Sequence, residues 1–520
     1  MHQSETQFLI SSNHSLIFAR MDLKIYNSLS GKKELFTPII EGRLGMYVCG
    51  PTVYSDVHIG NVRTFTSFDV IYRYFLFLGY KVRYVRNITD VGHLEGDADS
   101  NAEDKISKKA RLEQLEPMEI VQKYTNGFHA MMRKFNNLDP SIEPRATGHI
   151  LEQIEMVEQI VKSGYGYEMN GSVYFDTNKL LRETDVYGQL SGRKVEDLLV
   201  ETRELKNQEE KRHPADFAIW IKADERHLLR WNAPWSEGFP GWHLECSVMS
   251  TKYLGERFDI HGGGNDLKFP HHENEIAQSY GACGHTPANY WLHSNMLLMN
   301  GRKMAKSEGN YITPPQLFTG DSPHISKAYS PMAIRFFFLQ AHYASTLDLT
   351  DSALSAAEKG YNRLMESYRT LNGLTSTVAS IDSALSKELE SGIRDAFEEM
   401  NDDFNVPKSL ARLFELCTTI NKMSDGQLNV DDAGQQALDN LKQGFKTLLF
   451  DIFGLLDESD ALSDDHMSQL DGLMQFIIEL RQQARTQKDW PTSDKIRDTL
   501  NEIAIELKDG KEGTKWSFKK

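Results

Sequence analysis

The chain has few cysteines and no long apolar run. Its 520 residues include four cysteines, Cys49, Cys246, Cys283 and Cys417, and this number is too small for a disulfide-stabilised secreted scaffold. No stretch approaches the roughly 20 apolar residues that a membrane-spanning helix needs. We therefore expect a cytoplasmic protein with reduced thiols and no membrane segment.

Basic residues are outnumbered by acidic ones. Lys and Arg total 58 against 74 Asp and Glu, which gives a formal net charge of −16. This charge argues against a protein that coats nucleic acid along its whole surface, but a local basic surface can still bind RNA. Residues 1–20 lack the apolar core of a signal peptide and the arginines of a transit peptide. We expect them to form an extension, with the folded protein starting at Met21.

The segment Pro51–Asn61 lies inside a βαβ pattern. The apolar run Gly45–Gly50 predicts a buried strand before it, apolar residues at helical spacing follow it, and Lys81–Arg86 predicts a second strand. In such a unit the loop meets a helix N-terminus, where free backbone N–H groups and the helix dipole bind phosphate. We expect His58 to donate to a phosphate oxygen and Gly60 to allow its close approach. Alone, this pattern is more typical of an ordinary helix start.

A second strand pattern ends in glycines. Phe258–Asp266 predicts a strand followed by the turn Gly262, Gly263 and Gly264. Three glycines let the backbone lie against a flat ligand, and Asp266 could accept hydrogen bonds from ribose hydroxyls. A glycine turn alone is weak support for a nucleotide site.

The segment Met299–Asn310 contains two lysines three residues apart. Lys303 and Lys306 lie in a predicted loop with flanking glycines. Such a loop can close over a triphosphate and offset the charge that develops on it. Without the other motifs, an ordinary charged surface loop would explain it equally well.

Four metal-binding side chains come from three separate places. Cys49 ends the first strand, Cys246 follows later, and His271 and Glu275 lie four residues apart on one face of a predicted helix. Two thiolates, an imidazole and a carboxylate suit Zn²⁺ better than Mg²⁺ or Ca²⁺. The spacing does not distinguish this set from ordinary buried cysteines. A metalloprotease is excluded, because the H-E-x-x-H pattern begun at His272 lacks its second histidine.

The segments outside these motifs predict further parts of the fold. Residues 146–235 are mixed and charged and include a hairpin around Asn170–Gly171, which indicates an insertion in the sheet domain. From Ser352 onward apolar stripes predict a helical bundle, which Gln435–Leu456 and Ser463–Gln487 continue. Trp490–Lys520 predicts a helix and a hairpin with exposed aromatic and basic residues, a pattern typical of a small RNA-contacting module.

In this order, the motifs resemble the signatures of class I aminoacyl-tRNA synthetases. His58–Asn61 is similar to HIGH and Lys303–Ser307 to KMSKS; Met46–Gly50, Pro240–Cys246 and Phe269–Glu275 look specifically like cysteinyl-tRNA synthetases. The similarity extends from about residue 21 to the C-terminus.

Two residues depart from these signatures. Asn61 stands where HIGH has its second histidine, so the side chain can still donate a hydrogen bond but cannot carry charge. Ala305 stands where KMSKS has its first serine, and both lysines remain. We expect little loss of activity from the second departure.

The resemblance implies an α/β Rossmann-type catalytic domain with an insertion, followed by an α-helical bundle and a small α+β C-terminal anticodon-binding domain. The expected parts are an extension (1–20), the first Rossmann half (21–145), an inserted connective subdomain (146–235), the second Rossmann half (236–300), the KMSKS loop with a stem-contact region (301–350), the bundle (351–460) and the anticodon-binding domain (461–520).

The resemblance also implies the reaction and its site. The carboxylate of L-cysteine would attack the α-phosphate of ATP, bound with Mg²⁺, and the cysteinyl-adenylate would esterify the terminal adenosine of tRNA(Cys) on a monomeric enzyme. The implied catalytic residues are His58, Asn61, Lys303 and Lys306. The implied ATP-binding residues are these four with Gly60, Gly262, Gly263, Gly264, Asp266 and Ser307; those for the amino acid are Gly50, Thr52 and Trp242; those for tRNA are Arg485, Trp490, Asp494 and Asp509.

By the same resemblance, one zinc ion per chain is held by Cys49, Cys246, His271 and Glu275 and binds the substrate thiolate. An apolar pocket would separate cysteine from serine or alanine by only about 1–3 kcal/mol. A thiolate–zinc bond is available to cysteine alone, so editing should be unnecessary.

Two other functions remain open at this stage. A ligase that joins cysteine to an amino-sugar uses the same adenylate, but it lacks an anticodon-binding end, so residues 352–520 favour tRNA. A non-catalytic paralogue that binds tRNA or cysteine is suggested only by Asn61 and Ala305. Cysteine-dependent ATP–pyrophosphate exchange distinguishes an enzyme from such a binding protein.

Overall fold

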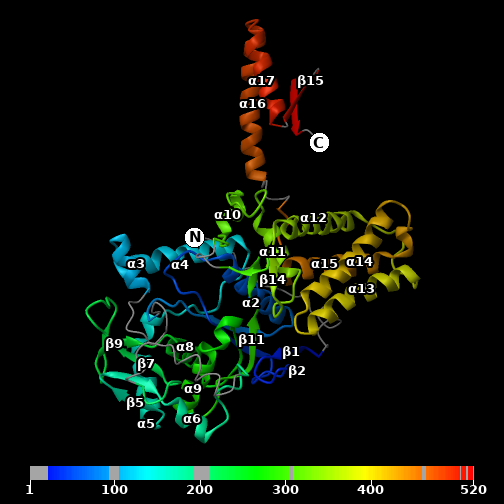
Figure 1. Ribbon diagram of the computed structural model, residues 1–520. Helices are drawn as coiled ribbons and strands as arrows, with labels where there is room; N and C mark the ends of the chain where they lie inside the picture. Colours follow the sequence, from blue (N-terminus) through cyan, green and yellow to red (C-terminus); the bar gives the residue numbers. More distant parts are fainter. Residues whose placement is uncertain are drawn as a thin grey trace. The chain divides into compact units, whose positions relative to one another are not determined.

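The computed structural model describes residues 22–92, 105–192, 211–304, 309–458, 464–503, 505–510 and 513–518. The expected extension at residues 1–20 therefore lies outside the described residues. The chain forms two compact units, Met1–Leu456 and Asp457–Lys520, and each is considered by itself (Figure 1).

The first unit combines three sheets and a hairpin with many helices. Its strands are β1 (Lys24–Asn27), β2 (Lys32–Leu35), β3 (Arg43–Val48), β4 (Lys81–Arg86), β5 (Gly166–Met169), β6 (Ser172–Phe175), β7 (Phe217–Lys222), β8 (Trp231–Asn232), β9 (Glu237–Pro240), β10 (Phe258–Gly264), β11 (Ala288–Ser294), β12 (Leu297–Met299), β13 (Arg302–Lys303) and β14 (Leu347–Leu349). Its α-helices are α2 (Ile59–Phe77), α3 (Lys105–Glu113), α4 (Pro117–Lys134), α5 (Ile150–Lys162), α6 (Thr177–Glu183), α8 (Leu244–Leu254), α9 (His271–Cys283), α10 (Pro314–Thr319), α11 (Pro331–Leu339), α12 (Asp351–Gly373), α13 (Ala384–Asn401), α14 (Val406–Ser424) and α15 (Gln435–Lys446).

The central sheet is parallel, with strand order β11-β10-β3-β4. Both of its faces are covered, so most residues of its strands are buried. Met46 and Val48 of β3 pack into the apolar cluster that contains the core face of α2. Tyr47 and Cys49, which alternate with them, pack with residues of α8. The period of two therefore directs Cys49 to the face that carries Cys246.

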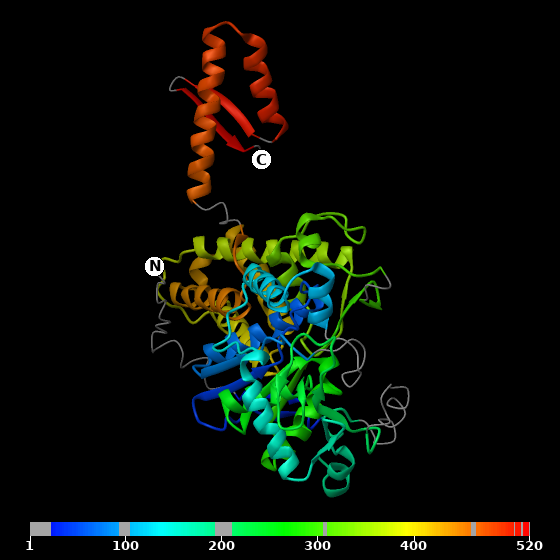
Figure 2. The ribbon, with the colours of Figure 1, turned by 90° about the vertical axis from the view of Figure 1, so that its left-hand side faces the viewer.

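The insertion predicted between the two halves forms an antiparallel sheet, β5-β6-β7-β9-β8. The predicted hairpin is confirmed: Asn170 and Gly171 join β5 to β6 with φ angles of 55° and 90°, which suit a tight two-residue turn. Figures 1 and 2 both place this sheet and the helices α12–α15 at different ends of the unit, with α2 between them.

The helices α12–α15 form the predicted bundle and share one apolar core with the parallel sheet. The side chain of Asn405 accepts a hydrogen bond from the backbone N–H of Lys408 and caps α14, with Pro407 in its first turn.

A buried ion cluster joins α2 to the end of the bundle. The Asp69 Oδ2 atom of α2 accepts from Arg73 Nε at 2.8 Å and from Arg335 Nη2 at 2.5 Å. Arg73 also donates to the carbonyl of Asp451, and Arg335 to that of Phe453 at 2.7 Å. One carboxylate thus holds two guanidinium groups, which in turn hold the chain just before the first unit ends.

The second unit contains α16 (Asp464–Thr486), α17 (Trp490–Glu502), and the hairpin of β15 (Ile505–Gly510) with β16 (Gly513–Phe518). The predicted tail helix and hairpin are confirmed. The prediction that Ser463–Gln487 continues the bundle is wrong, because Met474 of α16 packs against Leu500 of α17 and Ile505 of β15. An apolar stripe specifies that a helix face is buried, but not which partner covers it.

Within the described ranges, every helix is too short or too polar to cross a membrane.

We expect Asp69→Ala to destabilise the first unit by about 3–5 kcal/mol, because it leaves two buried guanidinium groups without their carboxylate. A urea titration followed by tryptophan fluorescence measures this loss. The control is Asp382→Ala, which removes the partner of Lys387 in an exposed ion pair and should change stability much less. Equal midpoints for both variants would show that the buried cluster contributes little.

Candidate functional site

His58, the first residue of the HIGH-like motif, caps the N-terminus of helix α2. The Nδ1 atom of His58 accepts from the backbone N–H of Gly60 at 3.1 Å and of Asn61 at 3.3 Å, and so caps the helix. A neutral imidazole with Nδ1 as acceptor carries its proton on Nε2, which is therefore a donor. The expectation that these two backbone amides would be free for phosphate is wrong. The donor that His58 offers at this helix end is its Nε2–H group, because Nδ1 is occupied by the two backbone amides.

The two signature motifs lie close together. A Cβ atom added to Gly60 would lie 3.6 Å from the Cε atom of Met304, and the ring centroids of His58 and Tyr311 are 6.0 Å apart. Lys303 is exposed at the end of β13. Lys306 and Ser307 lie outside the described residues, as does Ala305.

The segment Met299–Asn310 that contains Lys303 and Lys306, here called the lysine loop, is described up to residue 304 and from residue 309. A small sheet, β13-β12-β14, fixes its first described part. Asn300 and Gly301 turn the chain between β12 and β13 with φ angles of 50° and 75°. The backbone N–H of Gly301 donates to Asp348 Oδ1 at 2.9 Å, and Asn310 Nδ2 donates to the carbonyl of Lys303 at 2.9 Å. Lys303 is thus presented from a supported hairpin.

The glycines at the end of β10 face protein side chains. A Cβ atom on Gly262 would lie 2.3 Å from the ring of Phe68, and one on Gly263 would lie 2.9 Å from the ring of His272. These two glycines therefore allow α2 and α9 to pack closely on the strand, which the sequence alone did not indicate. Gly264 is half-buried and Asp266 is exposed beyond the strand end.

The loop after β3 is pinned to the loop after β4. The backbone N–H of Gly50 donates to Asn87 Oδ1 at 2.7 Å, and a Cβ atom on Gly50 would lie 1.6 Å from the Asn87 carbonyl oxygen. Thr52 forms a parallel bridge with Thr89, whose hydroxyl donates to the buried carboxyl of Glu245. Any side chain at position 50 would push the two loops apart.

The four predicted metal ligands meet in one buried cluster. Their ligand atoms all lie within 4.8 Å of one another. The Sγ atoms of Cys49 and Cys246 are 3.7 Å apart, and His271 Nε2 lies 3.4 Å from Cys246 Sγ and 3.3 Å from Glu275 Oε1. Residues from β3, α8 and α9 are thus brought to one point.

Two further histidines border this cluster, and the sequence analysis missed them as site residues. His261 Nε2 lies 2.8 Å from Glu275 Oε2, and His272 Nε2 lies 3.3 Å from Cys49 Sγ. With Cys49 and Glu275 they form a second group of possible ligands. The sequence carries no signal for them, because their position depends on the register of the sheet: His261 is the neighbour of Tyr47 on β3, two residues before Cys49.

The donor set fits a divalent, thiophilic ion. Burial raises the pKa of the Cys246 thiol to about 12 and that of the Cys49 thiol well above its usual value. Burial also raises the pKa of the Glu275 carboxyl. Without a cation the two thiols would stay protonated, whereas a bound metal stabilises the thiolates and the carboxylate and displaces the protons. Sulfur and nitrogen donors with one carboxylate favour zinc.

Trp242 flanks the cluster. Its ring centroid is 4.8 Å from that of His271, and the side chain is half-buried. The indole therefore lies against the imidazole of a candidate metal ligand, a position compatible with contact to a bound amino acid.

The four residues predicted to contact tRNA all belong to the second unit. Arg485 lies in the last turn of α16, and Trp490 opens α17 with 55% of its surface exposed. Asp494 pairs with Arg497 at 3.2 Å, and Asp509 lies in β15 opposite Thr514. They therefore come from three different elements.

Comparison with known proteins agrees with this geometry. The family model "tRNA synthetases class I (C) catalytic domain" matches residues 35–359, and a model of the DALR domain matches residues 397–457. The cysteine–tRNA ligase of Bacteroides thetaiotaomicron is 51% identical over 498 residues, covering 96% of this chain and 99% of that protein. Those of Porphyromonas gingivalis and Deinococcus radiodurans are 50% and 45% identical, with 95% of this chain covered in each case and 99% and 96% of the relatives.

The chain belongs to the cysteine–tRNA ligase family of class I aminoacyl-tRNA synthetases. The parallel sheet and the helical DALR region of this family correspond to the sheet and bundle described above. A methionyl-tRNA synthetase from Mycobacterium tuberculosis, solved in complex with methionyl-adenylate, shares the fold with a TM-score of 0.58. It is 13% identical, and the match covers 79% of this chain and 91% of that one.

We expect Cys246→Ser to lower the zinc content of the purified protein to a small fraction of the wild-type value, because it replaces a soft thiolate by a hydroxyl. Elemental analysis by mass spectrometry measures the metal per chain. Cys417→Ser is the matched control: Cys417 is equally buried but lies in the bundle core, so its removal should leave the zinc content unchanged. Wild-type zinc in the Cys246 variant would remove this residue from the ligand set.

Proposed function

We propose that this ligase activates L-cysteine with Mg²⁺-bound ATP, forms cysteinyl-adenylate and pyrophosphate, and transfers the cysteinyl group to the 3′ end of tRNA(Cys). The main support is the buried cluster of two thiols, an imidazole and a carboxylate next to both signature motifs, in a chain that belongs to the cysteine–tRNA ligase family. No side chain needs to act as a nucleophile, because the substrate carboxylate attacks the α-phosphate itself.

In this proposal the signature residues stabilise charge on the phosphates. The Nε2–H of His58 and the amide of Asn61 donate at the helix start, while Lys303 and Lys306 approach from the loop. The support is the short distance between the two motifs at Gly60 and Met304. Gly264 and Asp266 would contact the adenosine. They lie at the carboxyl end of β10, and ligands of parallel α/β sheets bind at the carboxyl ends of the strands, which supports this role.

The amino acid would bind beside the buried metal cluster. Zinc held by Cys49, Cys246, His271 and Glu275 would supply a Lewis acid that binds the thiolate of cysteine in preference to a hydroxyl or methyl group. The loop at Gly50 and Thr52, held by the hydrogen bonds described above, would position the backbone of the amino acid. Trp242 would cover it from the side of His271.

The second unit would bind the anticodon. Exposed Trp490 offers a stacking surface for a base, and Arg485 offers a donor for the backbone. Asp494 and Asp509 would read base edges. This division assigns activation to the first unit and tRNA selection to the second.

One chain carries both signature motifs and the whole metal-binding set, which supports a monomeric enzyme. Its four cysteines are unpaired, which fits a reducing compartment such as the cytoplasm.

We expect cysteine-dependent ATP–pyrophosphate exchange that is lost when a chelator removes zinc and returns when zinc is restored. Lys303→Ala should lower this exchange by about a hundredfold or more, because it removes one preorganised charge from the phosphates. Lys327→Ala is the control, since Lys327 is an exposed lysine paired with Glu358. Exchange that does not require cysteine would contradict the proposed substrate.

We expect truncation after Leu456 to abolish charging of tRNA(Cys) while exchange continues, because the cut falls between the two compact units. A cut near residue 350 should instead destroy the first unit, because it removes the bundle and the carbonyl acceptors of Arg73 and Arg335. Acceptor activity is measured with total tRNA and radiolabelled cysteine. A full-length protein that performs exchange but charges no tRNA would favour the amino-sugar ligase.

A further inference from the structure

Arg63 is a buried arginine on the signature helix α2, two residues after Asn61. Its side chain is 1% exposed, and burial lowers the pKa of its guanidinium to about 10, so the group remains charged at neutral pH. A buried charge is costly unless it is well compensated. The groups that compensate the charge of Arg63 therefore indicate its role.

Four backbone carbonyl oxygens accept hydrogen bonds from this guanidinium. Nη1 donates to Asn295 at 3.0 Å and to Met296 at 2.7 Å. Nη2 donates to His342 at 3.4 Å and to Ser345 at 2.5 Å. The two acceptor segments are more than forty residues apart in the chain, and each bond fixes backbone rather than a side chain.

Both acceptor segments lead directly into the small sheet that carries the lysine loop. Asn295 and Met296 precede β12, and Ser345 precedes β14. These two strands pair with each other, and β12 also pairs with β13, which ends at Lys303. Arg63 therefore connects the helix that begins at His58 to the base of the sheet that presents Lys303.

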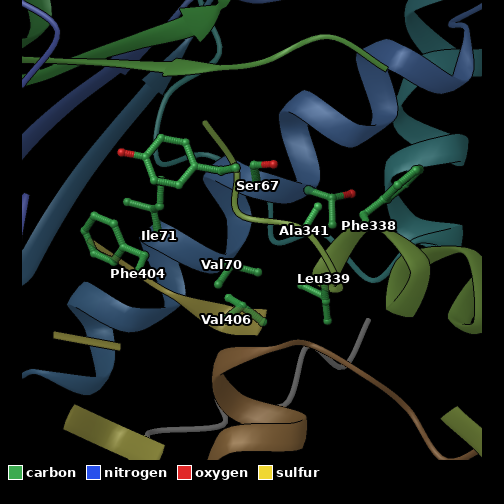
Figure 3. Close-up of a pocket in the computed structure, with 10 residues that line it drawn as sticks. Ser67, Val70, Ile71, Phe338, Leu339, Ala341, Phe404 and Val406 are labelled. Atoms are coloured by element: carbon green, nitrogen blue, oxygen red, sulfur yellow. The ribbon is translucent and has the colours of Figure 1, made fainter. Parts of the chain in front are cut away.

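A small cavity of about 20 Å³ lies between α2, the end of α11 and the turn before α14, next to the acceptor at His342. Figure 3 shows Ser67, Ala341 and Phe404 around it. Other bonds also hold the segment beside this cavity: the N–H of Asn295 donates to the carbonyl of Tyr343 at 2.8 Å, and the Tyr343 hydroxyl donates to Asp403 Oδ1 at 2.8 Å. Arg63 therefore acts together with these bonds and adds the connection to α2.

We propose that Arg63 is a positioning residue for the activation step: its clamp on four carbonyls sets the distance between His58–Asn61 and the lysine loop. This inference rests on the proposed function. An error of about 1 Å in the placement of charge-stabilising groups can cost a hundredfold in rate even when the altered residue is remote from the reacting atoms. The clamp thus acts on catalysis through Lys303, at the end of β13, without touching ATP.

The test compares Arg63→Lys with Arg335→Lys in the full-length, zinc-loaded protein. Lysine keeps the charge but has a single ammonium that cannot reproduce the planar fork of donors. Arg335 is a matched control, since it is 0% exposed and also donates to backbone carbonyls, but it joins α2 to the end of the bundle. Kinetics of ATP–pyrophosphate exchange, thermal unfolding and zinc content are measured for each variant.

We expect Arg63→Lys to lower kcat for exchange by about ten- to a hundredfold, with zinc content and the KM for cysteine unchanged. Arg335→Lys should lower Tm but keep the wild-type kcat per folded molecule. A second variant, Asp348→Ala, leaves Arg63 intact but removes the acceptor of the Gly301 N–H in the same sheet. It should reproduce the loss of kcat if placement of the loop is what matters, and it keeps the test open if Arg63→Lys does not fold.

Wild-type kcat in Arg63→Lys, or a fall in kcat matched by an equal loss of zinc and of affinity for cysteine, would overturn the positioning role. Wild-type kcat in Asp348→Ala would overturn it as well. Absence of cysteine-dependent exchange in the wild-type protein would overturn the proposed function itself, so the two failures are distinguishable.

Discussion

Buried guanidinium groups hold helix α2 at two points, and the rest of the first unit is arranged around this helix. Near its start Arg63 fixes the segments that lead to the lysine loop. Further along the helix, Asp69 accepts hydrogen bonds from Arg73 of the same helix and from Arg335 of α11. These two arginines donate to the carbonyls of Asp451 and Phe453 at the end of the first unit. Charged groups sealed from water require specific partners, whereas apolar contacts tolerate sliding. The relative placement of the signature motifs, sheet and bundle therefore depends on directional bonds as much as on the shared apolar core.

The local structure could largely be predicted from the sequence, because its determinants are local. The strand before Cys49, the turn at Asn170–Gly171 and the cap at Asn405 each follow from periodicity or from the chemistry of one or two residues. The set of four candidate metal ligands follows only from the resemblance to a family, because these residues come from three distant segments and their spacing carries no signal.

The features that could not be predicted arise from contacts between distant segments. His261 borders the cluster only because β10 pairs with β3 in one register, and Gly262 lacks a side chain because Phe68 occupies that space. The backbone amides of Gly60 and Asn61 donate to His58 Nδ1 and cap α2, instead of being free to bind phosphate as the sequence predicts. The partner of α16 could not be predicted for the same reason, because an amphipathic pattern indicates that a face is buried but not which element covers it.

The alternation along β3 has a consequence for how this protein can change over evolutionary time. Successive side chains here face opposite sides of the sheet. Met46 and Val48 face α2, whereas Tyr47 and Cys49, the residue directly after the strand, face α8. Inserting or deleting a single residue before Cys49 would exchange the two faces, so that the thiol would point into the packing of α2 and a core side chain into the metal cluster. Substitutions here can be tested by selection one at a time, but a change in length damages the packing and the metal cluster in a single event, so this strand should have kept its length wherever the chemistry persists.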